Sequence, residues 1–412
     1  MMKKLLGVLL VLVVAAIGYW LVAPRQPMIS DAAKSFDGFA AALIDEQAIP
    51  GLAIAVVKDR KIVHMRGYGF ADLRSRRPMT PDTPMNIASI SKPILGIVLL
   101  QLRDKGRLDL DADINRFLPF RVDHPQAKGR PITLRQLATH TSGIADYYDT
   151  ADYQPGADSP TPLTMYLRSL LSPAGARYDA GAHYLDAQPG TAREYSNLGA
   201  GVAGAVAERA GGAPLAALAR DNIFAPLGMA NSSWLLADYP AGKLATRYEV
   251  YQCLPYTGLC ASTGEPKRNY LIGKIFRPAH ADRRVEPYPQ FGNPNYPDGG
   301  VNASARDLTL LAQSLLADGK AGDGRLLSPA AFDEMLKLQL PPDIDDRQRF
   351  FWRDRDGMTG HAGSDDGVYT SFYFDRAKGD AIIVLMNRTP DLETENAMAR
   401  LFARIKTDLL RR

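Results

Sequence analysis

Cysteine is scarce in this chain of 412 residues, which contains only Cys253 and Cys260, in the stretch QCLPYTGLC. Two cysteines exclude a dense disulfide framework, and the lack of a nearby histidine argues against a cysteine-based metal site. The pair could close a short disulfide loop in an oxidising compartment, or it could remain as two free thiols. We therefore treat the pair as a disulfide candidate and expect no bound metal.

A strong excess of one charge is also missing. The chain has 49 Lys and Arg against 45 Asp and Glu, a formal net charge of +4. This balance and the absence of long basic runs argue against nucleic acid as a partner. The chain has no G-x-S-x-G or P-loop motif, and the G-x-G-x-x-G stretch at residues 199–204 lies inside a predicted helix, where a dinucleotide-binding fingerprint would need a preceding strand. We therefore expect neither an α/β-hydrolase triad nor an organic cofactor.

Long apolar runs are absent except at the N-terminus, where Lys3 and Lys4 precede the apolar residues 5–23. Such a run is long enough to cross a bilayer as a helix, and the preceding positive charges predict that the rest of the chain is exported. A cleaved signal peptide is the alternative, although Pro24 is a poor residue to follow a cut. Residues 1–24 are thus predicted as a membrane anchor or signal segment. The remainder is expected to be periplasmic or extracellular.

Strand-like patterns are found towards both ends of the exported part, residues 25–412. Residues 51–69 contain two β-rich runs on either side of a polar turn at Lys58–Lys61, and residues 367–375 and 381–387 flank a turn near the C-terminus. Helical patterns dominate between them, and residues 240–298 resemble a loop. This order predicts an α+β fold with an antiparallel sheet built from both chain ends, flanked by helices. A mainly helical lobe, about 105–298, is expected as an insertion.

The stretch NIASISKP, residues 86–93, begins a strongly apolar helix and offers two serines, a lysine and a proline. Residues three apart share one face of a helix, so Ser89 can meet Lys92, whereas the adjacent Ser91 diverges from it. Pro93 is acceptable in the first turn because the first four amides of a helix have no internal partner. A serine hydroxyl beside an amine is a candidate nucleophile, although a serine at this place is more often only a cap.

Two further motifs follow in order. REYSNLG contains Tyr195 and Asn197 before a helix, and GHAGSDDG contains His361 and Gly363 before a strand. S-x-x-K, Y-x-N and H-x-G in this order resemble the penicillin-binding protein and serine β-lactamase superfamily. The form of the motifs is similar to the class C β-lactamase branch, with its related esterases and D-amino peptidases. Similar stretches cover nearly the whole exported chain.

The resemblance implies a β-lactamase/transpeptidase-like fold and a covalent mechanism. Ser89 would attack a carbonyl group and form an acyl-enzyme, while Lys92 and Tyr195 would handle its proton as one coupled unit. Asn197 would hold Lys92 and contact the substrate. The backbone N–H groups of Ser89 and Ser364 would form an oxyanion hole.

The third motif departs from the K-T-G of β-lactamases, since His361 replaces the lysine that would attract a substrate carboxylate. Together with His361, Gly363 and Ser364 are predicted to line the substrate site. We therefore expect an esterase or peptidase that acts on small-molecule or peptide substrates. A β-lactamase or a peptidoglycan DD-carboxypeptidase is the alternative. A tethered scaffold without activity is a further alternative, and the sequence does not indicate an oligomeric state.

Overall fold

The structure is a computed structural model that describes residues 33–127, 129–253, 260–262 and 283–411, together with residues 7, 9–15 and 18. None of the helices in this part of the chain is both long and apolar enough to cross a membrane. Most of the predicted anchor or signal segment, residues 1–24, lies outside the described residues. The anchor therefore stays a prediction.

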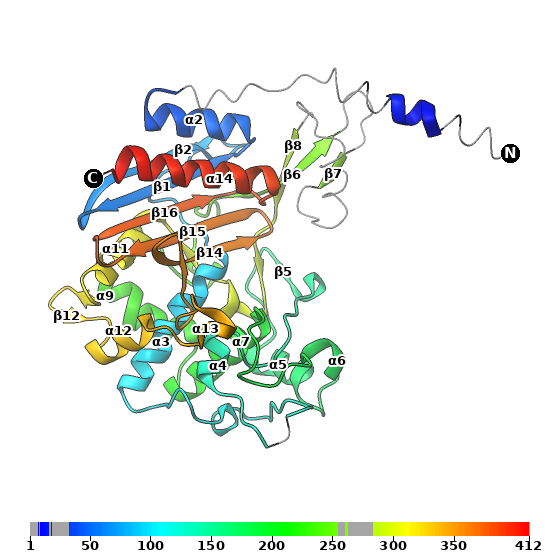
Figure 1. Cartoon of the computed structure of the whole chain (residues 1–412), viewed down its shortest axis with the longest axis vertical. Coiled ribbons are helices and arrows are strands. Elements are labelled where there is room, and N and C mark those ends of the chain that lie inside the picture. Colours follow the sequence, from blue (N-terminus) through cyan, green and yellow to red (C-terminus); the bar gives the residue numbers. More distant parts are fainter. Residues whose placement is uncertain are drawn as a thin grey trace.

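The centre of the fold is a seven-stranded sheet with the order β13-β14-β15-β16-β1-β2-β3, and every neighbouring pair is antiparallel. Its first and last strands in sequence come from the two ends of the chain, as predicted (Figure 1). The strands are β1 (Gly51–Lys58), β2 (Lys61–Asp72), β3 (Arg77–Pro78), β13 (Arg353–Arg355), β14 (Met358–Asp365), β15 (Val368–Asp375) and β16 (Asp380–Met386). The predicted α+β class is confirmed.

The β1–β2 hairpin turns at Asp59 and Arg60, whose φ angles are 50° and 63°. Two-residue hairpin loops need such left-handed residues to match the twist of the strands. The turn predicted at Lys58–Lys61 is therefore confirmed, and β1 is placed between β2 and β16, with Leu52 opposite Met386.

Alternate residues of the central strands belong to two different cores, because side chains alternate across a sheet. In β16, Ile383 and Leu385 join the large core of the helical lobe, whereas Ile382 and Val384 join a smaller core. The smaller core is covered by α2 (Phe36–Glu46) and α14 (Leu392–Arg404), which lie together on one face of the sheet (Figure 1). On the other face, α11 (Ala305–Leu316) contacts β1, β15 and β16.

The helical lobe is organised around α3 (Ser91–Asp104) and α7 (Asn197–Gly211), which pack against each other. Further helices are α4 (Leu134–Ala138), α5 (Leu163–Leu171), α6 (Ala180–His183), α8 (Leu215–Ala219), α9 (Ala225–Leu227), α12 (Pro329–Leu336) and α13 (Pro342–Asp345). Shorter 3-10 helices include η2 (Ala88–Ile90), η3 (Ile114–Arg116), η4 (Thr150–Asp152), η6 (Leu236–Asp238) and η7 (Tyr296–Asp298), and π-helical turns are η5 (Arg220–Phe224) and η8 (Ile405–Leu409). Small two-stranded pairs are β4 (Met85–Asn86) with β10 (Asn302–Ala303), β5 (Gln154–Pro155) with β9 (Phe291–Gly292), and β11 (Lys320–Ala321) with β12 (Gly324–Arg325).

Two features differ from the sequence prediction. The predicted loop at 240–298 contains strands β6 (Arg247–Cys253), β7 (Cys260–Ser262) and β8 (Arg283–Tyr288), which form a separate sheet. The flanking prolines and glycines obscure these short strands in the sequence. In addition, the H-x-G stretch lies within β14 and not before a strand.

The two cysteines occupy directly opposite positions of the β6–β7 pair. Opposite residues of an antiparallel pair have Cα atoms about 4.5–5.5 Å apart, a spacing that a disulfide can bridge. The side chains of Cys253 and Cys260 lie outside the described residues, so the disulfide stays a prediction.

The position of Ile383 in the large core predicts a strong effect of truncation. Ile383→Ala should lower the free energy of unfolding by about 2–5 kcal/mol, because it leaves a cavity in a packed interior. Ile62→Ala on β2 is the matched control, since Ile62 is 44% exposed and its truncation should cost only about 0.5 kcal/mol. Urea unfolding of both variants measures the difference, and equal losses would contradict this assignment of the core.

Candidate active site

Ser89 lies in the 3-10 turn η2, between β4 and the start of α3. The turn begins with Ala88, whose φ of 47° is unusual for a residue with a side chain. The carboxamide oxygen of Asn86 accepts a hydrogen bond from the Ala88 amide at 2.9 Å and supports this conformation. The α-helix itself begins at Ser91, and Pro93 lies in its first turn as expected.

The two serines of this stretch have different environments. Ser91 is fully buried, donates to the Ala88 carbonyl at 2.7 Å and accepts from the Val301 amide at 3.0 Å. Its hydroxyl is thus occupied by backbone partners. Ser89 is only partly buried and faces Lys92 and Tyr195, as the helical spacing predicts.

Lys92 is fully buried, and its ammonium group donates to three acceptors. Nζ lies 3.1 Å from Ser89 Oγ, 2.6 Å from Asn197 Oδ1 and 2.6 Å from the Asp298 carbonyl oxygen. An ammonium group has three N–H donors, so all of them are used. The lysine head is therefore held in one orientation beside the Ser89 hydroxyl.

Tyr195 approaches Ser89 from the segment just before α7. Its hydroxyl donates to Ser89 Oγ at 2.8 Å, and Lys92 Nζ lies 4.9 Å from the centre of its ring. Ser89 is thus in contact with both residues of the predicted proton-handling unit. The structure brings Ser89, Lys92, Tyr195 and Asn197 together, although they come from segments far apart in the sequence.

His140 holds the Tyr195 segment in place. Its carbonyl oxygen accepts from the Glu194 amide at 2.9 Å, and its Nδ1 accepts from the Ser196 amide at 3.3 Å. The ring lies 4.4 Å from the Tyr195 ring, and burial, followed by the charge of Lys92, lowers the pKa of His140 well below its usual value. These contacts make His140 a packing and hydrogen-bonding residue beside the site.

The third motif lies on β14, which closes the site from the side of the sheet. A side chain at Gly363 would place its Cβ 2.4 Å from Thr370 Oγ1 and 2.5 Å from the Ile87 carbonyl oxygen. Only glycine therefore allows β14 to approach the Ser89 turn so closely. Ser364, the next residue, is exposed at the edge of the site.

His361 lies on the same strand, with its ring 6.4 Å from the Tyr195 ring. Its Nδ1 lies 2.5 Å from the Ala362 carbonyl oxygen. Burial, followed by the nearby charge of Lys92, lowers the pKa of His361 to about 3. The imidazole is therefore neutral at pH 7, and it supplies no positive charge where β-lactamases carry a lysine.

Sequence reasoning misses the residues behind Lys92 and Asn197. Asn295 is buried and donates to the Asn197 carbonyl oxygen at 2.9 Å and to the Asp298 carboxylate at 3.3 Å. It therefore connects two of the three residues that accept from Lys92. Burial raises the pKa of the Asp298 carboxyl group to about 7, although Lys92 opposes this shift. The stretch GNPNYPDGG resembles a loop, and only its run of polar residues beside glycines hints at this role.

Comparison with protein families decides the assignment, since residues 36–405 match the family described as Beta-lactamase. The chain belongs to the Beta-lactamase family. The resemblance inferred from the three motifs is therefore confirmed, as is the expected kind of fold.

Several curated Beta-lactamase relatives are similar over part of their length. The esterase EstB of Burkholderia gladioli is 34% identical over 203 residues, which are 47% of this chain and 49% of that protein. A D-aminopeptidase of Cereibacter sphaeroides is 36% identical over 181 residues, 44% of this chain and 32% of that protein. The matches thus span half the length of these relatives or less.

Solved structures show the same fold. The D-amino acid amidase of Ochrobactrum anthropi SV3 superposes with a TM-score of 0.66 at 22% identity, covering 90% of this chain and 98% of that chain. FmtA from Staphylococcus aureus has a TM-score of 0.63 at 18% identity, covering 93% of this chain and 91% of that chain. At these identities the likeness concerns the fold alone.

The contact between Tyr195 and Ser89 predicts the behaviour of Tyr195→Phe. Loss of the hydroxyl should reduce kcat/KM for an activated ester by roughly 10²–10⁴-fold, since proton transfer loses a positioned group. Tyr184→Phe is a matched control, because the Tyr184 hydroxyl donates to the Leu171 carbonyl oxygen at 2.9 Å and has no contact with Ser89. Similar rates in both variants would show that Tyr195 takes no part in proton transfer.

The low pKa of His361 predicts how stability depends on pH. An unfolded histidine takes up a proton near pH 6.5, whereas folded His361 does so only near pH 3. Between these values the unfolded state binds more protons, so His361 reduces folded stability as the pH falls from 6.5 towards 3. His361→Gln should show a smaller drop in Tm between pH 7 and pH 5 than the wild-type protein. An identical drop in both would refute the prediction.

Proposed function

We propose that this protein is an exported serine acyl hydrolase that forms an acyl-enzyme on Ser89 and cleaves ester or amide bonds. The observation that carries the proposal is the pair of contacts at Ser89 Oγ, 3.1 Å from Lys92 Nζ and 2.8 Å from Tyr195 Oη. A serine hydroxyl needs a neighbouring group that takes its proton before it can attack. Lys92 and Tyr195 are the two groups within reach.

In the proposed reaction, the Lys92–Tyr195 unit starts with one proton fewer than an ammonium group and a phenol together hold, so it can accept a proton. Ser89 Oγ forms a bond to the substrate carbonyl carbon while its proton passes to this unit. The negative charge on the carbonyl oxygen is received by the amides of Ser89 and Ser364. The bond to the leaving group then breaks, and the unit returns the proton to that group. A water molecule then attacks the acyl carbon while the same unit takes one of its protons. The bond between Ser89 Oγ and the acyl carbon breaks, and the unit returns the proton to Ser89 Oγ.

The neutral state of His361 favours substrates without a carboxylate beside the bond that is cleaved. A β-lactam or a peptidoglycan stem peptide presents such a carboxylate, and His361 offers it no positive charge. Relatives named esterase and D-aminopeptidase agree with an ester or amide bond as the target. β-Lactamase and DD-carboxypeptidase activity are the second candidates.

Export is part of the proposal. Lys3 and Lys4 followed by the apolar residues 5–23 support translocation of residues 25–412, with the segment kept as an anchor or removed as a signal. Cell fractionation with N-terminal sequencing of the mature protein separates these two forms. Recovery of the protein from the cytoplasm would contradict export.

The proposed nucleophile predicts the result of Ser89→Ala. Turnover of a short p-nitrophenyl ester should fall by roughly 10⁴-fold or more, and labelling by a fluorophosphonate should disappear. Ser91→Ala is the matched control, since the Ser91 hydroxyl bonds to backbone groups. It should fold less stably and still be labelled. Equal labelling of wild type and Ser89→Ala would refute the proposal.

Substrate preference is tested with a panel of neutral esters, D- and L-amino acid amides, nitrocefin and a stem peptide. The esters and amino acid amides, which carry no carboxylate, should show a higher kcat/KM than nitrocefin and the stem peptide. A higher value for nitrocefin or the stem peptide would favour the second candidates.

A further inference from the structure

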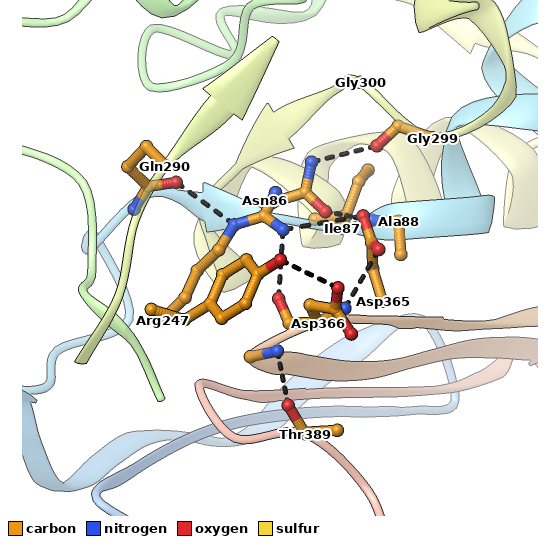
Figure 2. A network of polar contacts seen from close by, with 12 residues as sticks. Asn86, Ile87, Ala88, Arg247, Gln290, Gly299, Gly300, Asp365, Asp366 and Thr389 are labelled. Carbon is orange, nitrogen blue, oxygen red and sulfur yellow. Dashed lines mark hydrogen bonds and ion pairs between the residues drawn. The ribbon is translucent and has the colours of Figure 1, made fainter. Parts of the chain in front are cut away.

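The turn between β14 and β15 is attached to the separate β6–β8 sheet through Arg247 (Figure 2). Arg247 is only 2% exposed, and its Nη1 lies 3.5 Å from Asp365 Oδ2 and 3.0 Å from the Asp366 carbonyl oxygen. Its Nε donates to Gln290 Oε1 at 3.2 Å. One buried guanidinium group therefore contacts two successive residues at the end of β14.

Close packing supports the same attachment. Gly367 has a φ of 76°, and a Cβ there would lie 2.3 Å from the Cβ of Arg247. The Gly367 amide donates to Thr389 Oγ1 at 2.6 Å, and the Tyr288 hydroxyl donates to Asp366 Oδ2 at 3.0 Å. The turn is thus contacted by β6, by β8 and by the segment that follows β16.

The attachment matters because this part of β14 has a paired strand on one side only. β13 pairs only with the first residues of β14, Met358 to Gly360, whereas the segment 361–365 pairs only with β15 among the described strands. The free side of this segment faces the Ser89 turn. The position of its backbone is therefore set by β15 together with the side-chain contacts at the end of the strand.

Asp365 directly follows Ser364, whose amide is one of the two predicted oxyanion donors. The other donor, the Ser89 amide, directly follows Ala88, which is held by Asn86 (Figure 2). Asn86 in turn donates to the Gly299 carbonyl oxygen at 2.9 Å. Each predicted donor thus has a neighbouring residue held by a buried side chain.

We propose that Arg247 and Asp365 are a positioning pair, which fixes the Ser364 amide so that it meets the negative charge developing on the substrate carbonyl oxygen. The inference rests on the proposed function, because it assumes acyl transfer at Ser89. The pair touches no reacting atom. It acts through the backbone between Asp365 and Ser364.

This role predicts a defect that is specific to the transition state. An oxyanion donor stabilises the tetrahedral species more than the bound substrate, so its displacement lowers kcat and leaves KM nearly unchanged. An arylboronic acid that forms a tetrahedral adduct with Ser89 Oγ should lose affinity in parallel. A general loss of folding would instead lower the fraction of active sites without changing the affinity of those that remain.

The test variant is Asp365→Asn, which keeps the size of the side chain and removes its charge. Asp354→Asn is the matched control, since Asp354 pairs with Arg349 at 2.6 and 2.7 Å beside the other end of β14. Rates are measured with a p-nitrophenyl ester per active site titrated by fluorophosphonate, and affinity with phenylboronic acid. We expect roughly 10–100-fold losses of kcat and of boronate affinity in Asp365→Asn, and none in the control.

Arg247→Lys provides a second variant if Asp365→Asn does not fold, because it keeps the charge and loses the forked geometry. It should show the same parallel losses. If the folded variant kept the wild-type kcat and boronate affinity, the inference would be wrong and the proposed function would still stand. A fall in kcat with unchanged boronate affinity would overturn it as well. Labelling of wild type that does not depend on Ser89 would overturn the proposed function and, with it, the inference.

Discussion

The burial of the Lys92 ammonium group is the constraint on which the site depends. A buried cation is costly unless every donor has an acceptor, and one unsatisfied donor costs about 1–3 kcal/mol or more. The three acceptors of Lys92 come from η2, from the start of α7 and from η7. These three segments must therefore meet at one point, which places Ser89 and Tyr195 beside each other.

The central sheet forms the remaining side of the site around Ser89. Gly363 lets β14 pack directly on the Ser89 turn, and Thr370 of β15 donates to the Ile87 carbonyl oxygen at 2.8 Å. The proposed oxyanion donors therefore come from a strand of the sheet and from the Ser89 turn, which pack closely against each other. Small displacements of β14 act on the reaction site directly.

Local spacing in the sequence predicts one part of the site. Ser89 and Lys92 are three residues apart, and helix geometry alone selects Ser89 over Ser91 as the partner of the lysine. The roles of Asn295 and Arg247 cannot be predicted from local spacing, because their partners lie far away in the sequence. Their own segments also contain prolines, glycines and short strands. The strand β14 cannot be predicted either, because its glycines hide the alternation of apolar and polar residues on which strand prediction relies.

The central position of β16 has a consequence for the order of assembly. β16 is the last strand of the chain among the described residues, yet it separates β1 from β15 and pairs with both, with Leu52 opposite Met386. The β1–β2 hairpin can gain this neighbour only after the whole helical lobe has been synthesised, and such long-range pairing is slow to form. The sheet, and with it the strand β14 beside Ser89, can form only after β16 has been synthesised.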